Sequence, residues 1–134
     1  MIRILLTLLL WIATVCSAYP YEIVERQFEV NVQRSDLVVI GTAVSERHQI
    51  KGDTSGLSFV TIAVHEVLKG KTINQLELLV TPEDVEFDPR CCCQGASYLL
   101  LLDEIELARF TAVNGRFGVH RIDEDGQPLC ESPN

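Results

Sequence analysis

The sequence has few basic residues for its length. Its 134 residues include 11 Lys and Arg against 19 Asp and Glu, a formal net charge of −8. Such a chain repels phosphate backbones and anionic headgroups at long range, so we expect no nucleic-acid partner and no electrostatic docking to membranes. The eight Gly and five Pro are scattered, unlike the composition of disordered or collagen-like chains. With 47% hydrophobic residues, the sequence predicts one globular domain with a core.

The N-terminal apolar run is too short to span a membrane. It covers Ile4 to Val15, whereas a membrane-spanning helix needs roughly 20 residues. A basic Arg3 precedes the run and small residues follow it up to Ala18, the layout of a secretory signal peptide. A retained anchor and lipidation at Cys16 are the alternatives. The sequence therefore predicts a signal peptide at 1–18, a mature domain at 19–134 that is secreted or periplasmic, and no membrane insertion after cleavage.

Hydrophobic periodicity predicts mainly β structure with one N-terminal helix. In residues 22–34, Val24, Phe28 and Val32 lie four apart, as on an amphipathic helix, although strand-like alternation competes with this interpretation. Residues 48–56 have the composition of a hairpin loop. Strands are predicted at 37–46, 59–69, 76–80, 98–102, 110–113 and 117–122.

Three details of these strands can be tested against a structure. In 59–69, period-two alternation places Val60, Ile62, Val64 and Leu68 on the core face. The strand 98–102 is apolar throughout and should be buried on both faces. Asn114-Gly115 is a strong signal for a two-residue hairpin between the last two strands. Five or six short strands with one helix predict a small barrel or sandwich, and the long first hairpin favours the barrel.

An ordered set of short motifs resembles the netrin-like domain. The set is Ser35-Asp36-Leu37-Val38-Val39, then Ala43-Val44-Ser45-Glu46 and Val67-Leu68-Lys69-Gly70, a Cys in the following loop, and Gly95 before Tyr98-Leu99. The resemblance spans about residues 25–122. It implies a small five- to six-stranded barrel of the oligonucleotide/oligosaccharide-binding (OB) type with one flanking N-terminal helix, as in the N-terminal domain of the tissue inhibitors of metalloproteinases.

The start of the mature chain departs from these inhibitors. Their mature N-terminus begins with a Cys whose amine and carbonyl chelate the protease zinc, and disulfides anchor it. Here the predicted start is Tyr19-Pro20-Tyr21, so no inhibitory residue has a counterpart. The resemblance therefore implies a fold and a partner class, a metalloprotease, but not the zinc-chelating mechanism, because function depends on the site more than on the fold.

Cys91-Cys92-Cys93 and Cys130 form the most reactive group of residues. In an oxidising compartment we expect a disulfide between Cys130 and one of the three, closing a loop of about 40 residues that is worth roughly 4 kcal/mol. Alternation along an extended segment would let Cys91 and Cys93 share a site, which makes them candidate ligands for a soft metal or a redox pair. A free pair and a vicinal disulfide both remain open. Standard zinc spacing is absent, so we predict no metal and no cofactor.

Sequence signals for catalysis are missing. Ser97 lies in Gly95-Ala96-Ser97-Tyr98-Leu99, which lacks the second Gly of a nucleophile elbow. His65 and His120 are expected at half-exposed strand positions, and Ser97 at the start of a strand. We therefore predict that the protein is not an enzyme.

The remaining candidates are polar loops. Carboxylates cluster between the third and fourth strands without the ligand ladder of a calcium loop, so we interpret them as a solvated acidic loop. Polar loops flanked by rigid strands are suitable contact surfaces. The sequence predicts an exported, non-enzymatic protein-binding module, with a thiol- or metal-handling protein using Cys91 and Cys93 as the alternative. The candidate contact residues are His48, Lys51, Asp53, Glu83, Asp84, Glu86 and Asp88.

Overall fold

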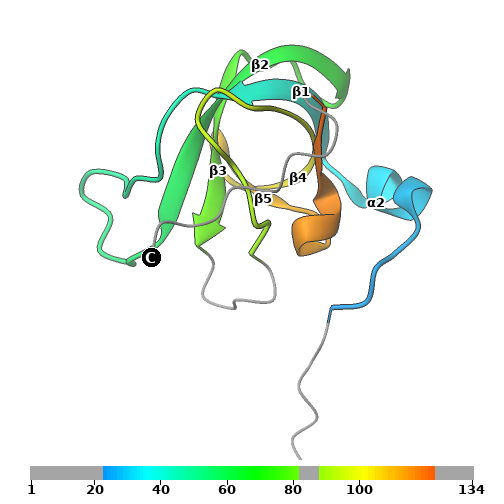
Figure 1. Cartoon of the computed structure of the whole chain (residues 1–134), viewed down its shortest axis with the longest axis horizontal. Helices are drawn as coiled ribbons and strands as arrows, with labels where there is room; N and C mark the ends of the chain where they lie inside the picture. The colour runs from blue at the N-terminus through cyan, green and yellow to red at the C-terminus, as the bar shows by residue number, and fades with distance from the viewer. Residues whose placement is uncertain (1–22, 82–87, 123–134) are drawn as a thin grey trace, which may run out of the picture.

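One helix precedes six strands in the computed structural model, which describes residues 23–81 and 88–122 (Figure 1). The elements are α2 (Phe28–Arg34), β1 (Leu37–Ala43), β2 (Ser58–Lys69), β3 (Gln75–Thr81), β4 (Ser97–Glu106), β5 (Arg109–Ala112), the 3₁₀ helix η2 (Gly115–Gly118) and β6 (Val119–Arg121). The predicted signal peptide 1–18, the start at Tyr19 and the predicted C-terminal tail 123–134 lie outside the described residues.

The strands close into a barrel because β1 pairs with two neighbours. The strand order is β1-β2-β3-β5-β4, and an additional β1–β4 pairing joins the two ends of the sheet. The β3–β5 pair is parallel, whereas the other pairs are antiparallel. β6 is an extra strand that pairs with β4 at Tyr98–Leu100. The prediction of a mainly β, small OB-type barrel with one helix is confirmed.

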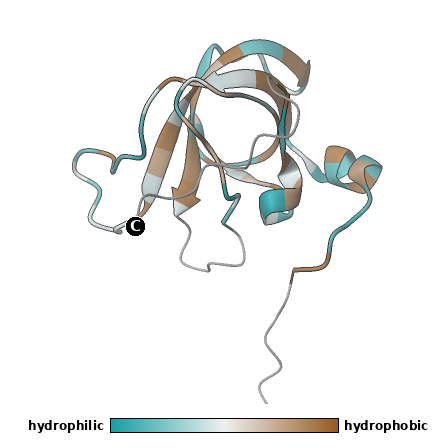
Figure 2. Ribbon diagram, in the orientation of Figure 1, coloured by the Kyte–Doolittle hydropathy of each residue, from teal (hydrophilic) through white to brown (hydrophobic). Residues whose placement is uncertain are grey.

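Hydrophobic residues recur along the barrel strands (Figure 2), and the buried ones form one core cluster. Tyr98 and Phe110 are its largest fully buried residues. Each buried aromatic or aliphatic side chain contributes about 1.5–3 kcal/mol from apolar area removed from water. A second, smaller cluster lies outside the barrel, where Val32 of α2 packs on Val38, Leu101 and Val113. β4 is therefore buried on both faces at its centre, as its unbroken apolar run predicts.

The prediction that Leu68 belongs to the core is wrong. Leu68 is 52% exposed, and Val67 packs against the core instead. The β1–β2 register explains the change, because Gly41 pairs with Val64 but Ile40 pairs with Glu66, which leaves His65 as an extra residue in β2 before Val67 and Leu68. A one-residue bulge moves every following side chain to the opposite face. Alternation alone cannot detect such a bulge.

The prediction of a hairpin at Asn114-Gly115 is also wrong. Among the described strands, β5 and β6 both pair with β4 and not with each other. Asn114 has the positive φ of 58° that a hairpin turn would need, but the chain then continues into η2. The side chain of Asn114 is buried and bonds to a distant segment: Oδ1 accepts from the N–H of Arg26 at 3.0 Å, and Nδ2 donates to the carbonyl of Val24 at 3.2 Å.

The helix is shorter than its periodicity suggests. It begins at Phe28 rather than residue 22. Val24 and Phe28 are exposed, and of the predicted apolar stripe only Val32 joins a hydrophobic cluster on the sheet, while the Phe28 ring packs edge-on against His120 of β6. Residues 24–26 are held by Asn114 instead of by helical hydrogen bonds. Over the ranges 23–81 and 88–122, no helix has the length and apolar character that crossing a membrane requires.

Candidate functional site

Two long connections leave the barrel at one end. Because β1 to β4 alternate in direction, the β1–β2 loop and the β3–β4 connection have neighbouring bases. Ser58 pairs with Thr81, and the N–H of Gly95 donates to the carbonyl of Ala43 at 2.7 Å. We call this end of the barrel the loop end, and it comprises the loop 44–57, the segment 88–96 and Ile122.

Hydrogen bonds fasten the first part of the β1–β2 loop to the barrel. The backbone of His48 exchanges two bonds with Phe59, at 2.9 and 2.7 Å. Arg47 Nη1 donates to Thr81 Oγ1 at 3.0 Å, which links the loop directly to the start of the β3–β4 connection. The rest of the loop extends away from the barrel (Figure 1). The loop therefore has a fixed base and a projecting tip, an arrangement typical of binding loops on a rigid scaffold.

Glu77 on β3 gives the loop a partly buried polar anchor. Its Oε1 accepts from Thr61 Oγ1 at 2.9 Å, and its Oε2 lies 3.1 Å from His48 Nε2. Oε2 is buried, and within the described ranges it makes no hydrogen bond. A buried carboxylate oxygen without a donor is costly, and His48 Nε2 is placed beside it. His48 Nδ1 lies 3.0 Å from the carbonyl of Glu46. His48, predicted as a contact residue, thus has a positioning role in the loop base.

Sequence reasoning missed Glu77, although its position in the strand pattern gave a signal. Leu76 and Leu78 point into the barrel on either side of it, so alternation places Glu77 on the outer face. Its partner His48 is 29 positions away in the sequence. Alternation cannot reveal that pairing, because it depends on how the loop folds back.

The other two predicted contact residues of this loop lie near its tip. The N–H of Ser55 donates to Asp53 Oδ1 at 2.9 Å, and this bond lowers the pKa of Asp53. The N–H of Asp53 bonds to the carbonyl of Ile50. Asp53 therefore shapes the turn, while the side chain of Lys51 is exposed.

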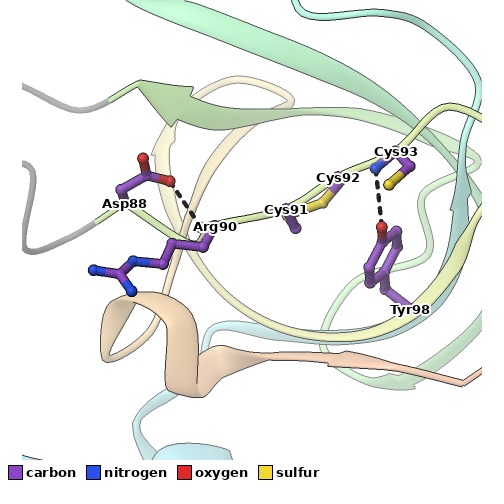
Figure 3. The surroundings of a disulfide bond; sticks show 6 residues. All are labelled: Asp88, Arg90, Cys91, Cys92, Cys93 and Tyr98. Atoms are coloured by element: carbon purple, nitrogen blue, oxygen red, sulfur yellow. Dashed lines mark hydrogen bonds between the residues drawn. A yellow bond between two sulfur atoms is a disulfide. The ribbon is translucent and has the colours of Figure 1, made fainter. Parts of the chain in front are cut away.

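The cysteine triplet crosses the same end of the molecule (Figure 3). Cys91 and Cys92 are joined to each other in a disulfide, and Cys93 is also disulfide-bonded. The N–H of Cys93 donates to the phenol oxygen of Tyr98 at 2.9 Å. Tyr98 is fully buried in the barrel, so its ring ties the triplet to the core.

The structure thus brings together Cys91 and Cys92, not the Cys91 and Cys93 pair suggested by alternation. Of the two alternatives left open, the vicinal disulfide is the one observed. A sulfur in a disulfide is not a thiolate ligand. In the described part of the chain, no group of three or more His, Cys, Asp or Glu side chains could hold a metal ion.

Cys130 lies outside the described residues, but the point from which its segment departs is known. The N–H of Ile122 donates to the carbonyl of Ser97 at 3.0 Å, so the chain leaves β6 at the loop end. The eight residues from there to Cys130 can span at most about 26–29 Å. With Cys91 and Cys92 bonded to each other, Cys93 is the member of the triplet that the predicted Cys130 disulfide would use.

The residues tested for catalysis have ordinary strand positions. β4 begins at Ser97, and His65 and His120 are exposed on β2 and β6. Thr42 Oγ1 lies 2.6 Å from His65 Nε2 and 2.8 Å from Ser97 Oγ. This chain of two hydroxyls and an imidazole links three adjacent strands across the barrel surface.

Of the acidic connection, only its last part is described. Asp88 Oδ1 accepts from the N–H of Arg90 at 2.7 Å, which uses the carboxylate in a local turn. Glu83, Asp84 and Glu86 lie outside the described residues.

Comparisons of the chain with protein-family models, with curated proteins and with solved structures found no match. The resemblance to the netrin-like domain therefore stays a prediction.

Proposed function

We propose that this protein is an exported, non-enzymatic protein-binding module of netrin-like type that contacts its partner with the loop end. One observation carries the proposal: the loop 44–57 and the connection that follows Thr81 share a base, joined by the Ser58–Thr81 pair and by the Arg47–Thr81 hydrogen bond. The bases of two loops that are distant in the sequence thereby lie side by side. A surface pre-organised in this way binds with a smaller entropy cost than two independent loops.

The anchored base supports the same proposal. His48 and Glu77 hold the loop to β3, and Ser45 Oγ accepts from the N–H of Thr61 at 2.9 Å. These contacts fix where the loop leaves the barrel and leave the side chain of Lys51 exposed. The tip can therefore contact a partner while the base keeps its geometry.

Site-specific photocrosslinking tests this function. A benzoylphenylalanine residue replaces Lys51 at the loop end or, as the matched control, exposed Thr72 at the opposite end. Crosslinking in the native extracellular or periplasmic fluid should join one protein to the Lys51 variant and none to the Thr72 variant. Crosslinks from the Thr72 variant alone would contradict the proposal, as would substrate turnover by the purified mature protein.

The resemblance makes a metalloprotease the partner class to test first. Zinc chelation by a terminal amine needs a rigidly held N-terminus, and the predicted start Tyr19-Pro20-Tyr21 has no cysteine to hold it. We therefore expect mature protein to bind such a protease without blocking its zinc. An inhibition assay before and after acetylation of the N-terminal amine checks this. Potent inhibition that acetylation abolishes would show that Tyr19 chelates the metal.

A further inference from the structure

The Cys91–Cys92 disulfide cannot stabilise the fold in the way that a structural disulfide usually does. Its two cysteines are adjacent in the sequence, so the bond closes no loop of intervening chain. A disulfide stabilises a fold mainly by restricting the unfolded chain, and that effect grows with the length of the loop it closes. The bond between Cys91 and Cys92 restricts almost nothing, so stability does not account for it.

The two sulfurs differ in their access to solvent. Cys91 is 4% exposed and belongs to the core cluster, whereas Cys92 is only partly buried and packs against that cluster. A thiolate approaching from solvent therefore meets Cys92 first. Attack on one sulfur of a disulfide expels the other as a thiolate, and here the expelled sulfur is that of Cys91.

We propose that Cys91 and Cys92 form a thiol–disulfide exchange site whose substrates are small thiols and dithiols. The incoming thiolate forms a bond to Cys92 Sγ, the Cys91–Cys92 bond breaks, and Cys91 takes up a proton. A second thiolate attacks the mixed disulfide and releases Cys92, which is protonated in turn. Two thiols are oxidised to one disulfide while the pair Cys91–Cys92 is reduced to two thiols. This site lies at the loop end, but its chemistry does not depend on the proposed protein-binding role.

The surroundings of the pair accommodate its reduced form. A free Cys packs as a small hydrophobic residue, and Cys91 already lies among apolar core side chains. The segment is held by contacts that do not involve the Cys91–Cys92 bond, namely Cys93 N–H to Tyr98 and Gly95 N–H to Ala43. Reduction of this pair should therefore leave the barrel folded.

The disulfide of Cys93 should behave differently. As the predicted bond to Cys130, it closes a long loop and stabilises the native fold, and the native fold stabilises it to the same extent. The Cys91–Cys92 bond gains no such protection because it closes no loop. We therefore expect Cys91–Cys92 to be reduced at a concentration of reductant about tenfold or more lower than Cys93 requires.

A stepwise reduction of the mature protein tests the proposal. The protein is equilibrated with increasing dithiothreitol, alkylated with iodoacetamide and mapped by mass spectrometry. The expected result is a plateau at which Cys91 and Cys92 are alkylated, Cys93 is not, and the unfolding midpoint is unchanged. At that plateau the protein should bind one equivalent of phenylarsine oxide, a probe of neighbouring thiol pairs, whereas the oxidised protein should bind none.

A double variant, Cys91→Ser with Cys92→Ser, is the matched control. It should lose both the plateau and the arsenical binding and keep the parent's unfolding midpoint. Reduction of Cys91, Cys92 and Cys93 together would overturn the proposal, as would unfolding at the plateau. The plateau is measured on the unaltered protein, so failure of the double variant to fold would leave that test intact.

Discussion

The two ends of the barrel are built by different means. At the end opposite the loop end, which we call the turn end and which comprises residues 35–36, 70–74 and 107–108, the connections are short and side chains close them. Lys69 Nζ donates to the carbonyls of Val32 and Gln33 at the end of α2, at 2.8 and 3.1 Å. Lys71 and Glu104 form an ion pair at 2.6 Å. The loop end instead has long connections and carries the cysteine triplet.

The difference follows from the entropy of closing loops. A short turn costs little to order, so a few hydrogen bonds to backbone carbonyls are enough to hold it. A long connection costs more, and a cross-link reduces that cost by restricting the unfolded chain. The turn end should therefore be sensitive to small backbone changes, and the loop end to the loss of its cross-link.

The largest expected effect is at the loop end. Cys130→Ala should lower the free energy of unfolding by about 3–4 kcal/mol in oxidising buffer, because it opens a loop of about 38 residues closed by Cys93. Chemical denaturation with and without a reductant measures the change. In the reductant the parent has lost the same bond, so the two proteins should then agree. An equal difference under both conditions would refute the cross-link, and a disulfide map joining Cys130 to Cys91 or Cys92 would refute its assignment.

The next effect is at the turn end, at Gly70. This residue has φ +99°, and a Cβ atom there would lie 2.4 Å from the carbonyl oxygen of Asp36. Gly70→Ala combines backbone strain with a steric clash and should lower the free energy of unfolding by about 2–4 kcal/mol. Gly52→Ala is the matched control, because Gly52 has φ +85° but open space around its Cβ position. That variant should lose only about 1 kcal/mol. Equal losses in denaturation experiments would show that the turn end is no tighter than the loop end.

A smaller effect is expected at Asn114, which fixes the segment before α2. Asn114→Gly keeps the positive φ but removes the two hydrogen bonds to Arg26 and Val24. We expect a loss of about 1–2 kcal/mol, because two backbone groups lose their partners. Hydrogen exchange should show faster exchange of the Arg26 amide and unchanged exchange in β1 to β4. Slow exchange at Arg26 in the variant would mean that other contacts hold this segment.

Features of the fold that depend on residues close in the sequence could be predicted, whereas features that depend on residues distant in the sequence could not. Strand positions and the barrel could be predicted because burial imposes alternation on each strand separately. The extra residue at His65, which turns Leu68 outward, could not be predicted, because a bulge is defined only relative to the partner strand. The side chain of Asn114 bonds to residues 88 and 90 positions earlier, and such contacts override a local turn signal.

The candidate site shows the same limit. The polar composition of the loop 44–57 identified it as a connection, but its anchor, His48 to Glu77, depends on the register of β3 against the folded loop. The vicinal disulfide was one of the two states that the triplet allowed. The sequence could not choose between them, because oxidation depends on how the segment packs against Tyr98 and the core.

The smallest expected effect is on the pH dependence of stability. It is tested with one carboxylate from each end of the barrel. Near the turn end, burial and the neighbouring carboxylate of Asp36 raise the pKa of Asp103. At the loop end, Ser55 lowers the pKa of Asp53. A raised carboxyl pKa means that the folded state binds more protons than the unfolded chain. Asp103 therefore favours folding when the pH is below its ordinary pKa of 3.8, and this contribution is lost as pH rises. Asp53 has the opposite sign, and its contribution is lost as pH falls.

Two Asn variants measured at neutral pH and near pH 3 separate these effects. Asp103→Asn removes the cost of ionising a half-buried carboxyl, so relative to the parent it should be more stable at neutral pH, by less than about 0.5 kcal/mol, and lose that gain near pH 3. Asp53→Asn should instead be less stable than the parent at neutral pH and approach it in acid. The free energy of unfolding from urea titrations checks both signs. Burial at Asp103 and hydrogen bonding at Asp53 require the stability difference between variant and parent to change with pH in opposite directions. A change in the same direction for both variants would contradict these two environments.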